Sequence, residues 1–172
     1  MRAALDWIYR LSAWAAAFFL LAIVVLTIAQ IVGRLVGVLV PVADEFAGFC
    51  LAATSFLALA ATFRSGEHVR VALVLGRLAP VGRRRLELWA LGAGFALTGY
   101  FAFFSVIMAW ESWQFAEVAQ GLVPTPLWLP QAGMALGVSV LALAMADDLV
   151  ALVVGREPSY RRAEAKVGLG PG

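Results

Sequence analysis

The sequence predicts an all-α integral membrane protein with four transmembrane helices. Of its 172 residues, 63% are hydrophobic, whereas soluble domains are about 45–50% apolar. Four apolar runs carry no charge, and each approaches or exceeds the roughly 20 residues that a helix needs to cross a bilayer. All seven prolines lie outside the interiors of these runs, and most tryptophans lie near their ends, as expected for side chains at the lipid–water boundary.

The first helix is predicted at residues 11–33, after a short N-terminal tail at residues 1–10. At a rise of about 1.5 Å per residue this run spans roughly 34 Å, which exceeds a hydrocarbon core of about 30 Å. A secretory signal peptide has an apolar core of only about 7–15 residues, followed by a cleavage site with small residues. This run is longer and ends at Arg34 without such a site, so we expect the helix to be retained.

The second helix is predicted at residues 44–63. Asp44 and Glu45 suit its first turn, where carboxylates face the positive end of the helix dipole. The stretch that follows contains the only histidine of the chain. Residues 69–81 then place arginines on one face and leucines and valines on the other. This segment is too short to span a bilayer, so we expect an amphipathic helix along the membrane interface.

The third and fourth helices are predicted at residues 86–110 and 128–149. A polar loop separates them, and prolines accompany the start of the fourth helix, where a missing backbone N–H is tolerated. Asp147 and Asp148 end the last apolar run, and we expect both to be solvated at the interface. The tail at residues 155–172 has the composition of a disordered segment. The four-helix membrane domain is thus expected at residues 11–154.

The basic residues predict how the helices are oriented. With four spans, the two termini and the second loop share one side of the membrane, and that side holds 12 of the 13 Lys and Arg residues. Basic residues are concentrated in cytoplasmic loops. We therefore expect both termini to be cytoplasmic and the third loop, which contains no Lys or Arg, to be external.

Several classes of function lack their required residues. A single cysteine excludes chemistry that needs a pair of thiols, and a single histidine excludes a haem held by two histidines. The chain has no phosphate-binding P-loop sequence, and no apolar run carries a charge at its centre, where ion pathways usually have one. We expect no catalytic, metal or substrate-binding residue, no cofactor and no nucleic-acid partner.

Four features, in this order, carry a resemblance to a known family. Glu45 begins the second helix, and Arg64-Ser65-Gly66-Glu67-His68-Val69-Arg70-Val71 follows that helix. Trp110-Glu111-Ser112-Trp113 ends the third helix, and Val123-Pro124-Thr125-Pro126-Leu127-Trp128-Leu129-Pro130-Gln131 leads into the fourth. Together with the number of helices and their orientation, these features resemble the DctQ-like small membrane subunit of tripartite ATP-independent periplasmic (TRAP) transporters. The likeness covers about residues 10–155.

The resemblance implies a scaffold function in the bacterial inner membrane. In this family a periplasmic binding protein captures an organic acid, such as a dicarboxylate. A large membrane subunit carries the acid by an elevator motion coupled to sodium, and the small subunit packs against the large one and stabilises it. The resemblance therefore implies that the chain is not an enzyme and that its partners are the large subunit, the binding protein and membrane lipids. The substrate is chosen by the other chains.

Candidate contact residues follow from the motifs and from the spacing of small residues. Gly133 and Gly137 match the G-x-x-x-G spacing that lets membrane helices approach closely. The basic run at the start of the third helix is expected to anchor lipid headgroups. The candidates for structural or partner contacts are Glu45, Arg64, Gly66, His68, Arg70, Gly133 and Gly137, and the expected headgroup anchors are Arg83, Arg84 and Arg85.

Two other functions remain open at this stage. One is a four-helix assembly factor or membrane anchor with no role in transport. The other is a self-contained small channel or exporter, which would need several copies to line a pore. The absence of a polar face on the four helices argues against the pore.

The orientation can be tested with single-cysteine probes. A probe at Ser65 should be protected from an impermeant thiol reagent added outside the cell, because the loop that contains it carries six of the basic residues. A probe at Gln120, in the loop without Lys or Arg, should be labelled. Labelling at Ser65 from the periplasm would overturn the orientation.

Overall fold

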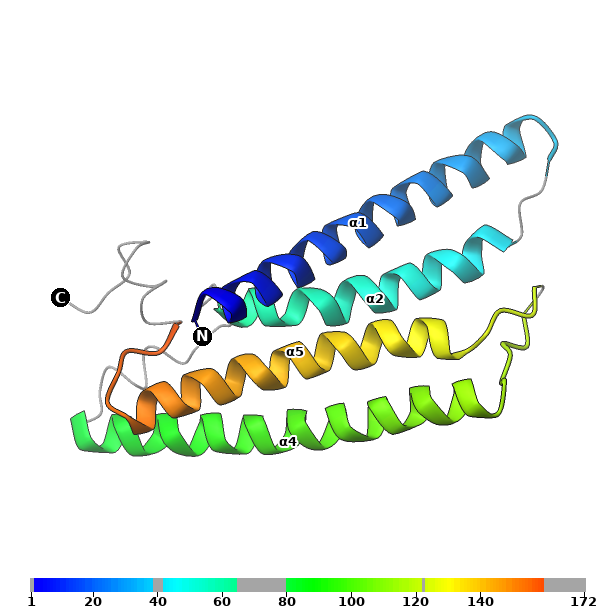
Figure 1. The fold of residues 1–172 in the computed structure, drawn as a ribbon. Helices are drawn as coiled ribbons and strands as arrows, with labels where there is room; N and C mark the ends of the chain where they lie inside the picture. Colours follow the sequence, from blue (N-terminus) through cyan, green and yellow to red (C-terminus); the bar gives the residue numbers. More distant parts are fainter. Residues whose placement is uncertain (1, 39–41, 65–79, 122, 160–172) are drawn as a thin grey trace.

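Four long helices make up most of the described chain (Figure 1). The computed structural model describes residues 2–38, 42–64, 80–121 and 123–159. In these residues each of the four helices is long and apolar enough to cross a membrane, which confirms the predicted all-α membrane fold. Their bounds are α1 (Arg2–Leu35), α2 (Val42–Arg64), α4 (Pro80–Gln114) and α5 (Trp128–Val153).

Each helix is longer than its uncharged run. The helix α1 begins at Arg2, within the predicted tail, and α4 extends from Pro80 to Gln114. The absence of charge marks the part of a helix that lies in hydrocarbon, whereas backbone hydrogen bonding continues into the interface. Residues 69–79 of the predicted interfacial helix lie outside the described residues. The last two residues of the predicted segment, Pro80 and Val81, belong instead to α4, and Pro80 is its first residue, where the missing N–H costs nothing.

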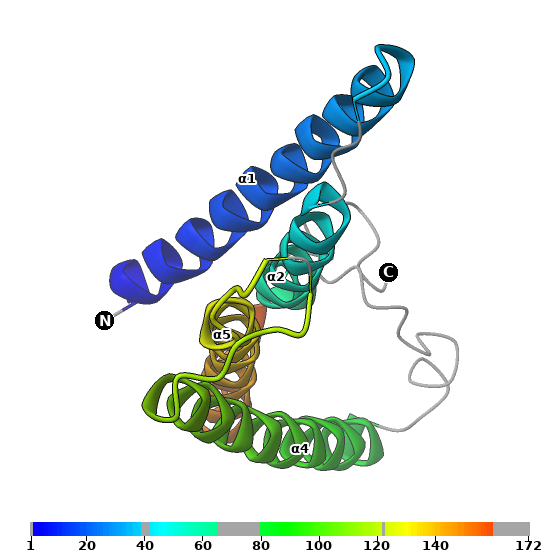
Figure 2. The same cartoon turned by 90° about the vertical axis from the view of Figure 1, so that its right-hand side faces the viewer.

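The helices form an open, curved layer in the order α1, α2, α5 and α4 (Figure 2). In this layer α1 packs on α2, α2 packs on α5, and α5 packs on α4, while α1 and α5 meet at only a few positions. Successive helices run in opposite directions, so the start of α1, the end of α2, the start of α4 and the end of α5 lie at one end of the layer (Figure 1). We call this the N-terminal end.

The helices α2 and α5 approach one another closely at two glycines of α5. A Cβ atom on Gly137 would overlap the backbone of Phe56 and Leu57 on α2, and a Cβ on Gly133 would lie 3.2 Å from the Cβ of Ala53. The two glycines of the G-x-x-x-G sequence therefore let the backbones of α5 and α2 approach one another. This contact lies within the chain itself.

The outer helices are attached by small side chains and a few polar contacts. On α1, buried Ala16 packs with Ala53 and Leu57 of α2, and the Ser12 hydroxyl donates a hydrogen bond to the carbonyl oxygen of Leu57 at 2.7 Å. On α4, buried Ala102 packs with Val138 and Ala142 of α5. Small residues and hydroxyl groups are the usual means of joining helices in lipid, where apolar side chains gain nothing by leaving it.

The third loop is folded back on itself at the opposite end of the layer. Val118 and Pro126 form a β-bridge, and the Leu127 amide donates to the Glu117 carbonyl oxygen at 3.0 Å. The Glu117 side chain accepts a hydrogen bond of 2.7 Å from the hydroxyl of Ser112, which is 1% exposed. The hydrogen bond between Ser112 and Glu117 thus fixes the start of the third loop to the end of α4.

The glycine contact predicts a large difference between two similar substitutions. Gly137→Ala should destabilise the folded chain by about 1–3 kcal/mol, because the added methyl group has no room against the α2 backbone. Gly99→Ala on α4 is the matched control, since a Cβ there meets nothing within 4 Å. It should be neutral or slightly stabilising. Thermal unfolding of the purified variants in detergent measures both, and equal midpoints would contradict the packing described.

Candidate functional site

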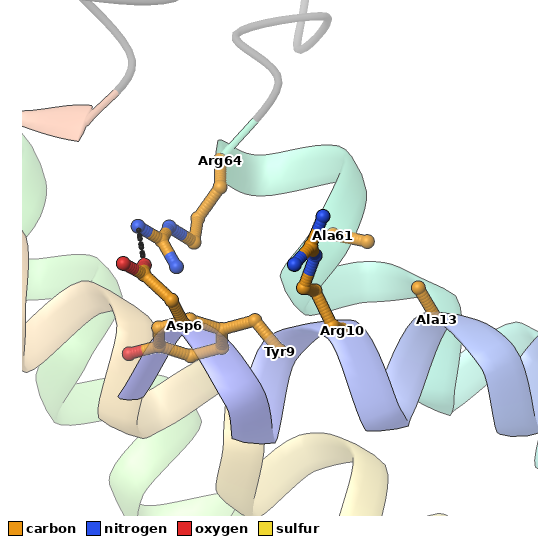
Figure 3. Close-up of a pocket in the computed structure, with 6 residues that line it drawn as sticks. All are labelled: Asp6, Tyr9, Arg10, Ala13, Ala61 and Arg64. Carbon is orange, nitrogen blue, oxygen red and sulfur yellow. Dashed lines mark hydrogen bonds and ion pairs between the residues drawn. The ribbon is translucent and has the colours of Figure 1, made fainter. Parts of the chain in front are cut away.

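A cluster of charged and aromatic side chains joins the start of α1 to the end of α2 (Figure 3). Arg64, the last residue of α2, donates from Nη2 to Oδ1 of Asp6 at 2.8 Å. Its guanidinium carbon lies 4.2 Å from the centre of the Tyr9 ring. The Arg64 side chain is 24% exposed and that of Asp6 is 56% exposed. An ion pair this accessible contributes about 0–1 kcal/mol, and the cation–π contact adds about 0.5–1 kcal/mol.

Tyr9 connects this cluster to the apolar core. It is only 4% exposed and packs in one buried group with residues of α2, α4 and α5, including Ala60, Leu91 and Leu152. Its hydroxyl group has no hydrogen-bond partner among the described residues. The Tyr9 ring therefore lies between the charged surface and the apolar core, and the Arg64 guanidinium group lies over the face of the ring.

Asp148 is buried, which corrects the expectation that it is solvated. It is 1% exposed. Its carboxylate accepts hydrogen bonds from the Ser159 backbone N–H at 2.8 Å and from the Ser159 hydroxyl at 2.6 Å. Pro158 is also fully buried. The chain after α5 thus turns back and covers the carboxylate, and this return could not be inferred from the helical pattern. Asp147, its neighbour, is partly exposed.

The three expected headgroup anchors lie in different surroundings at the N-terminal end. Arg83 forms an ion pair with Glu87, from Nε to Oε1, at 3.3 Å. Arg84 donates from Nη2 to the carbonyl oxygen of Leu152, at 3.4 Å. Arg85 is exposed. Two of the three arginines therefore contact the protein, and Arg84 does so near the end of α5, where backbone carbonyl groups lack helical partners.

Glu45 lies at the opposite end of the layer, against the third loop. A Cβ on Gly121 would overlap the Glu45 carboxylate, so the glycine leaves room for that side chain. One residue earlier, Asp44 accepts a hydrogen bond of 2.8 Å from the Gln30 side-chain amide of α1. The first turn of α2 thus contacts both the end of α1 and the third loop.

The polar side chains in the interiors of the four described helices are mainly hydroxyl groups. No group of three or more His, Cys, Asp or Glu residues that could hold a metal ion occurs in the part of the chain that the structure describes. Most hydroxyl groups within the spans bond to carbonyl oxygens, as Thr27, Ser55 and Thr62 do four residues back along their own helices. These three hydroxyl groups are therefore satisfied within their own helices.

The structure locates some of the candidate residues and leaves others undescribed. Gly66, His68 and Arg70 lie outside the described residues. Sequence reasoning missed Asp6, Tyr9 and Ser159, which make the main contacts at the N-terminal end. Asp6 and Arg64 are 58 positions apart, so the only available signal was that opposite charges flank two neighbouring spans on one side of the membrane.

The comparisons with known proteins give one match. The family model of the DctQ component of tripartite ATP-independent periplasmic transporters matches residues 23–155. No curated protein and no solved structure matches the chain. The match includes α2, α4 and α5 completely and the last part of α1, from residue 23 onward.

The buried carboxylate predicts unequal effects of two neighbouring substitutions. Asp148→Ala should destabilise the folded chain by about 1–3 kcal/mol, because it leaves the buried Ser159 donors without an acceptor. Asp147→Ala, the matched control, should change stability by less than about 0.5 kcal/mol. Ser159→Ala should lie between the two, since it removes one of the two hydrogen bonds. Thermal midpoints in detergent measure all three. Equal effects at Asp147 and Asp148 would contradict the contact.

Proposed function

The chain belongs to the DctQ family, the small membrane component of tripartite ATP-independent periplasmic transporters, and from this premise we propose that it is a scaffold subunit. In this proposal it stabilises the large transport subunit of a sodium-driven importer. The importer takes an organic acid, a dicarboxylate or similar compound, from a periplasmic binding protein. Family membership implies partnership with the large subunit and the binding protein, and it places the chain in the bacterial inner membrane.

The observation that carries the proposal is the uncharged interior of every span. The Asp, Glu and Arg side chains of α1, α2, α4 and α5 lie near the ends of those helices. Moving an ion or an acid through a bilayer usually requires ionisable or polar groups at mid-membrane depth. A subunit without charged side chains at that depth is suited to hold a partner in place, and the transport chemistry then belongs to the large subunit.

The shape of the layer supports the same function. Because the helices form an open layer, α1 and α4 each have one long side that is not covered by this chain (Figure 2). Large apolar side chains are exposed along them, including Phe18 and Val25 on α1 and Leu97 and Phe103 on α4. Such sides suit contact with lipid and with another membrane subunit. The chain would thereby widen the static frame against which the large subunit moves.

The proposed orientation places the N-terminal end in the cytoplasm and the third loop in the periplasm. This follows from the excess of basic residues at the N-terminal end. Glu45 and the folded third loop would then face the periplasm, where the binding protein delivers its ligand. In this orientation Glu111 and Glu117 are also on the periplasmic side, and Glu117 is held by Ser112.

The scaffold proposal predicts how transport depends on this chain. Vesicles containing this chain alone should take up no organic acid. Vesicles that also contain the large subunit and are supplied with the binding protein should take it up when sodium is present. Glu45→Gln should alter the stability of the complex or the rate of uptake, without changing the number of sodium ions per substrate, because no group of this chain binds the coupling ion.

The matched control is Glu111→Gln, which removes an exposed carboxylate at the same end of the layer. It should leave both the recovery of the complex and the rate unchanged. The measurement is sodium and substrate flux in reconstituted vesicles, together with co-purification of the large subunit. Uptake by this chain alone, or a changed sodium stoichiometry in Glu45→Gln, would refute the scaffold function.

A further inference from the structure

An open pocket of about 470 Å³ lies between the start of α1 and the end of α2 (Figure 3). Its lining combines charged groups with small apolar ones. Two guanidinium groups, one carboxylate and one aromatic ring lie at the charged part. The lining residues are Asp6, Tyr9, Arg10, Ala13, Ala61 and Arg64.

The charged groups of the pocket include more hydrogen-bond donors than acceptors. Asp6 is the single carboxylate of the lining and is paired with Arg64. Arg10 is exposed and has no ion-pair partner in the part of the chain that the structure describes. Arg64 is held in place by Asp6 on one side and by the Tyr9 ring on its face. A guanidinium group has five N–H donors, so both arginines have donors available for an incoming anion.

The position of Arg10 in the membrane identifies the kind of anion. Arg10 directly precedes the uncharged run at residues 11–33, so it lies at the boundary between hydrocarbon and water. Trp7 and Trp14 flank it along α1 and are 70% and 75% exposed. Exposed tryptophans on a transmembrane helix mark the level of the lipid headgroups. The pocket therefore opens at the depth where phospholipid phosphate groups lie.

The small side chains of the pocket suit the part of a lipid that follows its phosphate. Ala13 and Ala61 lie on facing helices, and their methyl groups leave the hollow between α1 and α2 unfilled. Further along α1, Phe18 and Leu21 are exposed and provide an apolar surface for an acyl chain. Along α1 the site thus presents charged donors first, then a hollow and then an apolar surface. A phospholipid presents its headgroup, its glycerol unit and its acyl chain in the same order.

We propose that this pocket binds the phosphodiester group of a membrane phospholipid between Arg10 and Arg64. The bound lipid would cover the junction of α1 and α2 and would fix the depth of α1 in the bilayer. Arginine is well suited to this contact, because its planar donors match the geometry of phosphate oxygens. The site is independent of the transport function, since it requires only that α1 and α2 span the membrane.

The test is lipid binding to the purified full-length chain. Native mass spectrometry from detergent, with added phosphatidylglycerol, measures the apparent affinity of the first bound lipid. Arg10→Gln should weaken that affinity by about tenfold, because it removes a charge-assisted contact. Arg34→Gln removes another exposed arginine, from the other end of α1, and should leave the first binding event unchanged. Arg10 is exposed, so its substitution leaves the folded chain intact.

A second pair of variants tests the shape of the pocket without changing its charge. Ala13→Leu fills the hollow and should weaken the first binding event, whereas Ala29→Leu, at an exposed position near the other end of α1, should not. Equal lipid affinity in Arg10→Gln and in the unsubstituted chain would overturn the proposal. Displacement of the bound lipid by inorganic phosphate would assign the pocket to a soluble anion and would overturn the lipid assignment.

Discussion

The close contact of α5 with α2 is the constraint on which the rest of the layer depends. The helix α1 is attached mainly through α2, and α4 is attached through α5. Lipid is as apolar as the helices, so association depends on close van der Waals packing and a few polar contacts. Gly137 permits that packing, because its missing side chain allows the α5 backbone to approach Phe56 and Leu57. A side chain at this position would separate one helix pair from the other.

Polar contacts at the ends of the helices add to the packing contacts between neighbouring helices. At the N-terminal end, Arg64 joins α2 to α1, Arg84 joins α4 to α5, and Asp148 holds the chain that follows α5. In the partly hydrated interface these contacts can form without the full cost of placing a charge in hydrocarbon. The ends of the helices are thereby fixed in position, while their middles carry no Asp, Glu, Lys or Arg.

This division fits the scaffold function that we propose. A static subunit needs broad apolar sides for its partner and for lipid, and it needs ends that hold its own helices in place. The exposed sides of α1 and α4 provide the apolar surface, and the contacts of Arg64 and Asp148 hold the helix ends in place. The proposed lipid site between Arg10 and Arg64 would add a lipid to the same junction, in the pocket between α1 and α2.

The sequence by itself determined the number of spans, their approximate positions and the family, because uncharged runs and local motifs depend on neighbouring residues alone. The G-x-x-x-G spacing indicated that Gly133 and Gly137 favour close packing, but only the tertiary structure showed that they pack against α2. The same limit applies to Asp148. Its position after an apolar run suggested solvation, and its burial depends on the return of Ser159 eleven residues later. Contacts between distant residues follow from how the helices and the chain ends are arranged in space, which no local pattern encodes.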